Sequence, residues 1–175
     1  MKRYALLLIA VLAVCASAKA QTPSNTFSLD AQALSLPYPG HAAAGTLAGG
    51  SFAVTPNFSL RSTNLIVPGA SFGAYFGGVE YALPVLSGKL NNASPNLAGS
   101  QFRFYVQASA GVDRISQAGA PDPAQHIAFL GGGGVDYAPK ADGKFSVRLV
   151  EVDYAKLPGL ANNTVVVSSG VKLSF

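Results

Sequence analysis

Two glycine-rich stretches are the first places in this sequence where chemistry is conceivable. Gly69, Ser71 and Gly73 have the G-x-S-x-G spacing of a serine nucleophile. That motif works only where a strand turns sharply into a helix, and no helical periodicity follows Ser71. The run 131–134 offers backbone amides to a phosphate, but it lacks the Lys and Ser or Thr that complete a phosphate-binding loop. Neither stretch therefore predicts a catalytic or nucleotide-binding site.

The other reactive side chains are equally sparse. His41 and His126 fall in or beside predicted loops, where a lone imidazole is usually just solvated. The chain has one Cys, at position 15, which excludes a disulfide framework and a cysteine-rich metal site. We therefore expect no enzymatic activity, no cofactor and no metal.

Composition points away from an ordinary soluble enzyme. Charged residues make up 11% of the 175 residues and hydrophobic ones 49%, with 19 Gly and no Trp. Soluble proteins carry roughly 25% charged residues. A chain so poor in charge and rich in apolar residues is neither a disordered polyelectrolyte nor a helical protein with a heavily charged surface.

The first twenty residues have the pattern of an export signal. Lys2 and Arg3 precede an unbroken apolar run over 5–16, and 18–20 read Ala-Lys-Ala, a cleavage site. The apolar run is shorter than the ~20 residues that a spanning helix needs. Cleavage after Ala20 is expected, with cleavage after Ala18 or lipidation at Cys15 as alternatives. The mature chain would then be 21–175.

Signal removal changes the charge balance. It lowers the number of basic residues from 12 to 9 against 8 acidic ones, so the net charge falls from +4 to +1. Nucleic-acid binding, which needs a basic surface, thus loses its support.

The mature chain reads as strands, because apolar and polar residues alternate with period two. The clearest case runs from Phe102 to Arg114, and the final segment 164–175 behaves alike. Eight strands are predicted, separated by turn signals rich in Pro, Gly, Asn and Asp. They cover about 25–36, 44–54, 57–67, 71–83, 101–114, 126–138, 144–156 and 164–175.

Alternation alone does not say which face meets water. A soluble sheet buries its apolar face, whereas a transmembrane barrel turns that face to lipid and fills its lumen with polar side chains. Long strands, few charges and aromatic residues toward strand ends favour the second arrangement. These aromatic residues are Tyr81, Phe102, Phe104, Tyr137, Phe145, Tyr154 and Phe175. The predicted fold is an all-β, eight-stranded antiparallel transmembrane barrel with up-and-down topology.

Most charged residues fall on the phase that would face the lumen. An eight-stranded barrel is just wide enough for side chains to fill it, and charges removed from water must pair. We therefore predict a polar network inside the barrel, with a gated ion path along the same charges as the alternative. Its members are Glu80, Arg103, Asp136, Arg148, Glu151, Asp153 and Lys172.

Two irregularities qualify this pattern. Strict alternation through 145–156 would turn Glu151 and Asp153 toward lipid, so a one-residue bulge near Val150 is expected to return them to the lumen. The segment 84–100 is long for a connection on the periplasmic side, and indicates either an insertion or a miscounted hairpin.

The C-terminal half resembles a known family. The chain ends Gly170-Val171-Lys172-Leu173-Ser174-Phe175, and Val171, Leu173 and Phe175 resemble the assembly signal of bacterial outer-membrane proteins. The region 102–175 resembles the second half of small OmpA-like and Opa-like eight-stranded barrels. Leu173 stands where an aromatic residue is more usual, and Ser169 interrupts the apolar series.

The resemblance implies a place and a role rather than a reaction. It implies the bacterial outer membrane, contact with lipid and lipopolysaccharide, and delivery to the assembly machinery through the C-terminal strand. The role would be structural or adhesive, with an unknown extracellular partner and with the loop 117–125 as the expected contact surface. Lipid-modifying barrels of this kind place Ser two residues after their His, but Ala43 and Ala128 occupy those positions here. The rival interpretation is a secreted lipocalin-like barrel, with Phe102, Phe104, Val106 and Phe129 inward around an apolar ligand and with Arg103 and Asp113 outward.

Overall fold

The structure is a computed structural model, and it describes residues 27–38, 41–68, 71–83, 101–115, 124–139, 144–160 and 162–175. The predicted export signal over 1–20 and the segment 84–100 lie outside these ranges. So does most of the loop predicted over 117–125, whose last two residues, Ala124 and Gln125, belong to a strand. Within the described ranges, no helix has the length and hydropathy of a helical membrane crossing.

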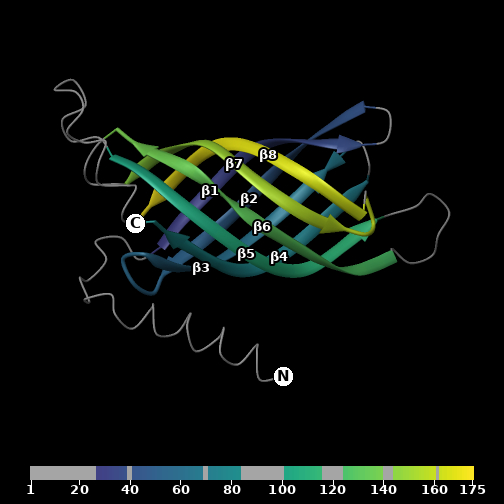
Figure 1. The fold of residues 1–175 in the computed structure, drawn as a ribbon, viewed down its shortest axis with the longest axis horizontal. Coiled ribbons are helices and arrows are strands. Elements are labelled where there is room, and N and C mark those ends of the chain that lie inside the picture. The colour runs from purple at the N-terminus through teal and green to yellow at the C-terminus, as the bar shows by residue number, and fades with distance from the viewer. Residues whose placement is uncertain are drawn as a thin grey trace.

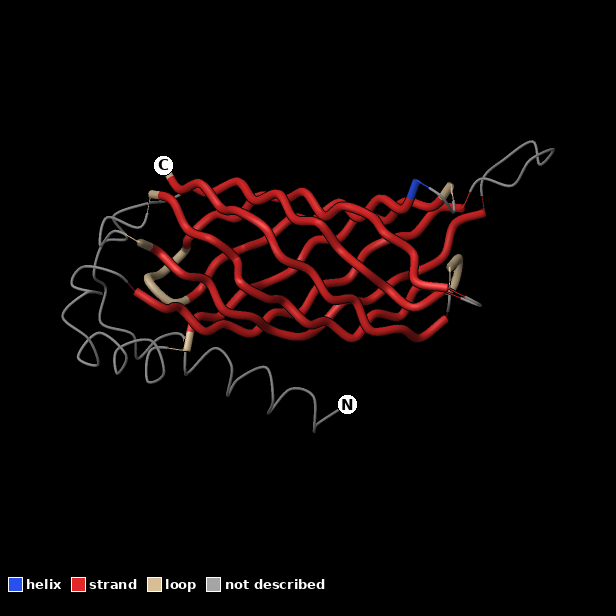
Figure 2. Tube along the Cα trace, turned by 90° about the horizontal axis from the view of Figure 1, so that it is seen from above, coloured by secondary structure: helices blue, strands red, loops and turns tan. Residues whose placement is uncertain are grey.

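Eight antiparallel strands close into one barrel in chain order, and β8 pairs with β1 (Figures 1 and 2). The predicted fold and strand count are therefore confirmed, with strand ends within three residues of their predicted positions. The strands are β1 (Phe27–Tyr38), β2 (His41–Ala53), β3 (Phe58–Val67), β4 (Phe72–Ala82), β5 (Gln101–Ile115), β6 (Ala124–Ala138), β7 (Phe145–Leu157) and β8 (Asn162–Ser174).

The carboxylate side chains of the described strands point into the barrel, and many bulky apolar side chains point out. On β5, Val106 is 46% exposed on the outer wall, whereas Asp113 is fully buried inside. Phe129 on β6 is also exposed. The arrangement expected of a soluble lipocalin-like barrel, with Val106 and Phe129 inward and Asp113 outward, is thus wrong for this chain.

Aromatic side chains gather at one end of the barrel, where β1 begins and β8 ends. We call this the terminal end and the opposite one the far end. The rings of Phe27 and Phe175 stack with centroids 6.4 Å apart, and those of Phe102 and Tyr137 lie 5.0 Å apart. Six of the seven aromatic residues singled out from the sequence lie at the terminal end. Tyr154 is the exception, because it lies near the far end of β7.

The lumen has two tiers, which the sequence pattern did not predict. Toward the terminal end the inward side chains are mostly charged or polar, and toward the far end they form a continuous apolar core. We call the latter the apolar tier. Its larger members are Leu34, Leu36, Leu47, Leu65, Val67, Phe72, Phe76, Leu130, Leu157 and Val166.

The predicted bulge in β7 is present. Val135 of β6 pairs with Val150 and the next residue, Asp136, pairs with Arg148, so Leu149 is the extra residue. The register with β8 shifts at the same place, between Arg148 and Glu151. Leu149 and Val150 are both exposed on the outer wall. The bulge therefore lets Arg148 and Glu151 both point inward, although three positions separate them.

Candidate functional site

The candidate site is the polar tier of the lumen, built from the inward positions of all eight strands. Strand alternation, with the bulge in β7, carries the charged side chains of this tier inward, and the small inward residues Gly49, Gly78, Gly132, Gly134 and Gly170 leave room for them. We call its interacting members the polar cluster. They are Asp30, Arg61, Glu80, Arg103, Tyr105, Gln107, Asp136, Arg148, Glu151, Asp153 and Lys172.

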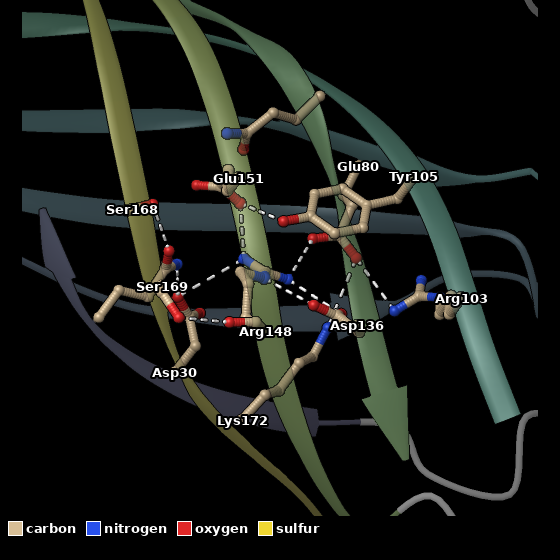
Figure 3. Close-up of polar contacts among 12 residues, drawn as sticks. Asp30, Glu80, Arg103, Tyr105, Asp136, Arg148, Glu151, Ser168, Ser169 and Lys172 are labelled. Carbon is tan, nitrogen blue, oxygen red and sulfur yellow. Dashed lines mark hydrogen bonds and ion pairs between the residues drawn. The ribbon is translucent and has the colours of Figure 1, made fainter. Parts of the chain in front are cut away.

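Arg148 lies at the centre of the polar cluster (Figure 3). Its Nε and Nη2 donate to both carboxylate oxygens of Asp136, at 2.7 and 3.1 Å. Its Nη1 donates to Glu151 at 2.7 Å, and Nη2 reaches Glu80 at 3.4 Å. The guanidinium also lies 4.4 Å from the ring centroid of Tyr105, a cation–π geometry. With Asp30 at 3.9 Å from Nη1, this fully buried cation is held by four carboxylates and a ring.

Arg61, on the opposite side of the barrel, provides the second centre. Its Nη1 donates to Glu151 at 2.9 Å and to Gln107 at 2.5 Å. Its Nη2 lies 3.4 Å from the carboxylate of Asp30. Because Glu151 also accepts from Arg148 and from the hydroxyl of Tyr105, this one carboxylate joins both arginines.

Glu80 gathers the remaining cations. Its Oε1 lies 3.1 Å from Arg103 and 3.4 Å from the ammonium of Lys172, while Oε2 faces both central arginines. The side chain of Arg103 is 32% exposed, so it forms the solvent-facing edge of the polar cluster. The other charged members are almost completely buried.

Six of the seven residues singled out from the sequence join one ion-pair network: Glu80, Arg103, Asp136, Arg148, Glu151 and Lys172. Asp153 lies in the same tier, where its Oδ1 accepts from Gln107 at 2.8 Å. Its Oδ2 has no hydrogen-bond partner among the described residues. Gln107, which also accepts from Arg61, therefore links Asp153 to the network.

Sequence reasoning missed Asp30, Arg61, Tyr105 and Gln107. Asp30 and Arg61 lie in strands whose alternation is weak in the sequence. A signal for Arg61 was nevertheless available, because it is the only Asp, Glu, Lys or Arg between positions 31 and 79. A lone charge within a strand of such a chain has to face the lumen or find a partner.

The absence of a side chain at Gly134 leaves space for the ring of Tyr105. A Cβ on Gly134 would lie 2.8 Å from the ring carbon that bears the Tyr105 hydroxyl, whereas the outward-facing Gly131 has only a carbonyl oxygen at 3.7 Å nearby. Without a side chain at 134, the Tyr105 ring fits between Arg148 and Glu151.

We expect Gly134→Val to lower the free energy of unfolding by about 1–3 kcal/mol, because overpacking displaces the Tyr105 ring. Gly131→Val, on the outer face of the same strand, is the control and should change it by less. The measurement is urea unfolding in lipid vesicles. Equal losses for the two variants would contradict the placement of Tyr105.

A separate polar contact lies at the far end of the lumen. The buried carboxylate of Asp113 accepts from the backbone N–H of Gly159 at 2.9 Å, and Nδ1 of His126 lies 2.9 Å from its other oxygen. This contact fixes the turn between β7 and β8, where Leu160 packs against the apolar tier. His126 is therefore engaged by a carboxylate rather than free in a loop.

The predicted assembly signal lies on the outer wall of β8. Val171, Leu173 and Phe175 are 44%, 46% and 64% exposed. The strand is also paired along both edges, because Phe175 exchanges backbone hydrogen bonds with Phe27 while β7 covers the other side. In the closed barrel the side chains of the signal are accessible, but its backbone is not.

The polar cluster is a filled interior in which the charged side chains pair with one another. Within the described ranges, no group of three or more His, Cys, Asp or Glu residues is placed to hold a metal ion. The carboxylates of the polar cluster are engaged by arginine, lysine or amide groups, and the apolar tier separates them from the far end.

Comparison with known proteins bears on the fold alone. No family model and no curated protein matches the sequence. Among solved structures, the chain is similar to Neisserial surface protein A, with 14% identity, a TM-score of 0.53 and coverage of 87% of this chain and 97% of that one. It is also similar to the N-terminal barrel of OprF from Pseudomonas aeruginosa, with 14% identity, a TM-score of 0.51 and coverage of 85% and 97%. A designed transmembrane β-barrel gives 15% identity, a TM-score of 0.52 and coverage of 90% and 100%. The architecture is that of small eight-stranded outer-membrane barrels.

Proposed function

We propose that this chain is exported and inserted in the bacterial outer membrane as a closed barrel with a structural or surface-interaction role. The proposal rests on how side chains are divided between the two faces of the barrel wall. Every carboxylate in the described strands is buried in the lumen, whereas many Val, Leu, Ile, Phe and Tyr side chains are exposed on the outer wall. That inside-out partition suits lipid outside and polar packing within. The terminal end would face the periplasm, and the far end would face outward.

The partners we propose follow from the same orientation. Among the described outward-facing residues, Arg114 and Lys156 are cations near the far end, where a phosphorylated outer-leaflet lipid such as lipopolysaccharide would supply negative charge. The accessible side chains of Val171, Leu173 and Phe175 support recognition by the assembly machinery before the strand is paired. We further propose that the loops at the far end contact the extracellular partner.

The lumen argues against the alternative of a gated pore. An ion that entered from the terminal end would meet the polar cluster and then the apolar tier, in which Leu36, Leu47, Leu65, Leu157 and Val166 are almost wholly buried. Moving an ion through such an apolar layer carries a large free-energy cost, because the ion loses its water. The proposed role therefore requires no flow through the barrel.

Planar-bilayer recording tests this proposal. We expect no steady single-channel current from the mature chain, because the apolar tier is closed. Insertion would be verified in the same sample by a change of gel mobility on boiling. Reproducible unitary currents from inserted protein would support the pore instead.

A further inference from the structure

The outer wall over β1–β3 contains a hollow of about 590 Å³ toward the terminal end. Gly50 leaves a position on this wall without a side chain, and the exposed rings of Phe27 and Phe52 with Leu60 stand around it. The hollow is lined by Phe27, Leu29, Ala48, Gly49, Gly50, Ser51, Phe52, Leu60, Arg61, Ser62 and Asn64. Its apolar walls therefore border two polar side chains of β3, Ser62 and Asn64.

Ser62 and Asn64 point outward, and their side chains form no hydrogen bond with each other or with a neighbouring residue. They alternate with the inward-facing Arg61, Thr63 and Leu65, and within the described part of the chain neither side chain makes a hydrogen bond. Asn64 is six residues from Phe58 along a tilted strand, which places it about 15 Å above the aromatic end and near the middle of an apolar band about 25 Å tall. No water is available there to satisfy an amide.

The wall of β7 and β8 is different. Its outward residues include Val152, Val165 and Val167, all exposed. The outward Ser169 is satisfied, because its hydroxyl donates to the backbone carbonyl of Arg148 at 3.0 Å. In the middle of that wall the outward polar side chain therefore has a partner, whereas Ser62 and Asn64 on the wall of β1–β3 have none among the described residues.

We propose that the β1–β3 wall is an interface between two copies of this chain, related by a two-fold axis near Asn64. An amide both donates and accepts, so two copies of Asn64 can satisfy each other across such an axis. The small residues Ala48 and Gly50 allow the two walls to approach closely. A lipid acyl chain fills the hollow but offers the amide no partner. This inference rests on the proposed membrane location.

Sedimentation equilibrium of the refolded mature chain in detergent micelles tests the interface. The wild type is expected to dimerise. Asn64→Leu, which removes the amide at similar size, should raise the dimer dissociation constant by about tenfold, the equivalent of two modest hydrogen bonds within a membrane. Gly50→Leu should also weaken the dimer by filling the hollow. Val152→Leu on the outer face of β7, which lies opposite β3 in the barrel, is the control and should leave it unchanged.

Two results would overturn the interface. One is a wild type that stays monomeric at every ratio of protein to detergent, with lipid alone filling the hollow. The other is an Asn64→Leu variant that dimerises as tightly as the wild type. In both cases a gel mobility that changes on boiling would leave the membrane barrel standing. Loss of that change in the wild type would overturn the membrane barrel and the interface together.

Discussion

Replacing Arg148 with Met is expected to destabilise the barrel by about 3–5 kcal/mol, the usual result of breaking a buried ion pair by removing one partner. Asp136, Glu151 and Glu80 all contact this guanidinium. Without it, Asp136 loses the two hydrogen bonds it accepts from Arg148, and the other carboxylates are left to Arg61 and the cations at Glu80. Met fills part of the vacated space without supplying a charge.

Urea unfolding in lipid vesicles would measure the loss, with Arg114→Met as the matched control. Arg114 is the same residue type near the exposed far end of β5, so its removal should change the free energy of unfolding little. If both variants lost the same small amount, the ion pairs drawn in Figure 3 would contribute nothing to folding.

The second large effect concerns the outer wall. Val167 is exposed near the middle of β8. Val167→Arg should lower the free energy of unfolding in vesicles by about 2–4 kcal/mol, because a cation on the lipid-facing surface is most costly at the midplane.

Asn163→Arg provides the position control for that experiment. Residue 163 lies on the same face of β8, close to its far end, where a cation should cost roughly 0–1 kcal/mol. A gradient between the two variants identifies lipid as the solvent of this wall. Equal tolerance of arginine at both positions would indicate water instead.

The strands and the orientation of their faces could be predicted from the sequence where only one face of a strand is apolar. In β5, Val106 and Val112 face outward while Gln107 and Asp113 face inward, so the period of two is unmistakable. The bulge was predictable for a similar reason, because no regular strand could place Arg148 and Glu151 on the same side.

The apolar tier was not readable from the sequence for the opposite reason. At the far end of β3, Leu65 and Val67 face inward and Ile66 faces outward. Both faces are apolar there, so alternation disappears and the segment looks like any buried strand. The inward side of such a segment becomes visible only once the barrel has closed.

The sequence predicted which charged residues belong to the polar cluster better than it predicted which of them contact one another. The phase of each strand determines whether a charge points inward. It does not determine that Arg61 meets Glu151, 90 positions away, or that Tyr105 lies over Arg148. Those contacts depend on strand register and on which inward positions are glycine. The contacts of the network could therefore be identified only from the three-dimensional structure, although most of its charged residues were predicted from the sequence.

The two tiers together explain how so small a barrel remains closed. The polar cluster ties strands on opposite sides of the lumen through Arg61, Glu80, Arg148 and Glu151. The apolar tier excludes water at the far end, and Asp113 anchors the turn between β7 and β8 beside it. A filled barrel agrees with the proposed structural or surface role.

The most direct test of the membrane barrel is the gel mobility of the mature chain, taken from the outer-membrane fraction, with and without boiling in detergent. We predict a compact, fast-migrating species in the unboiled sample and a slower one after boiling, since the closed barrel resists detergent until it is heated. A freely soluble protein with a single mobility would contradict the account, because its apolar outer wall would then have no solvent to face.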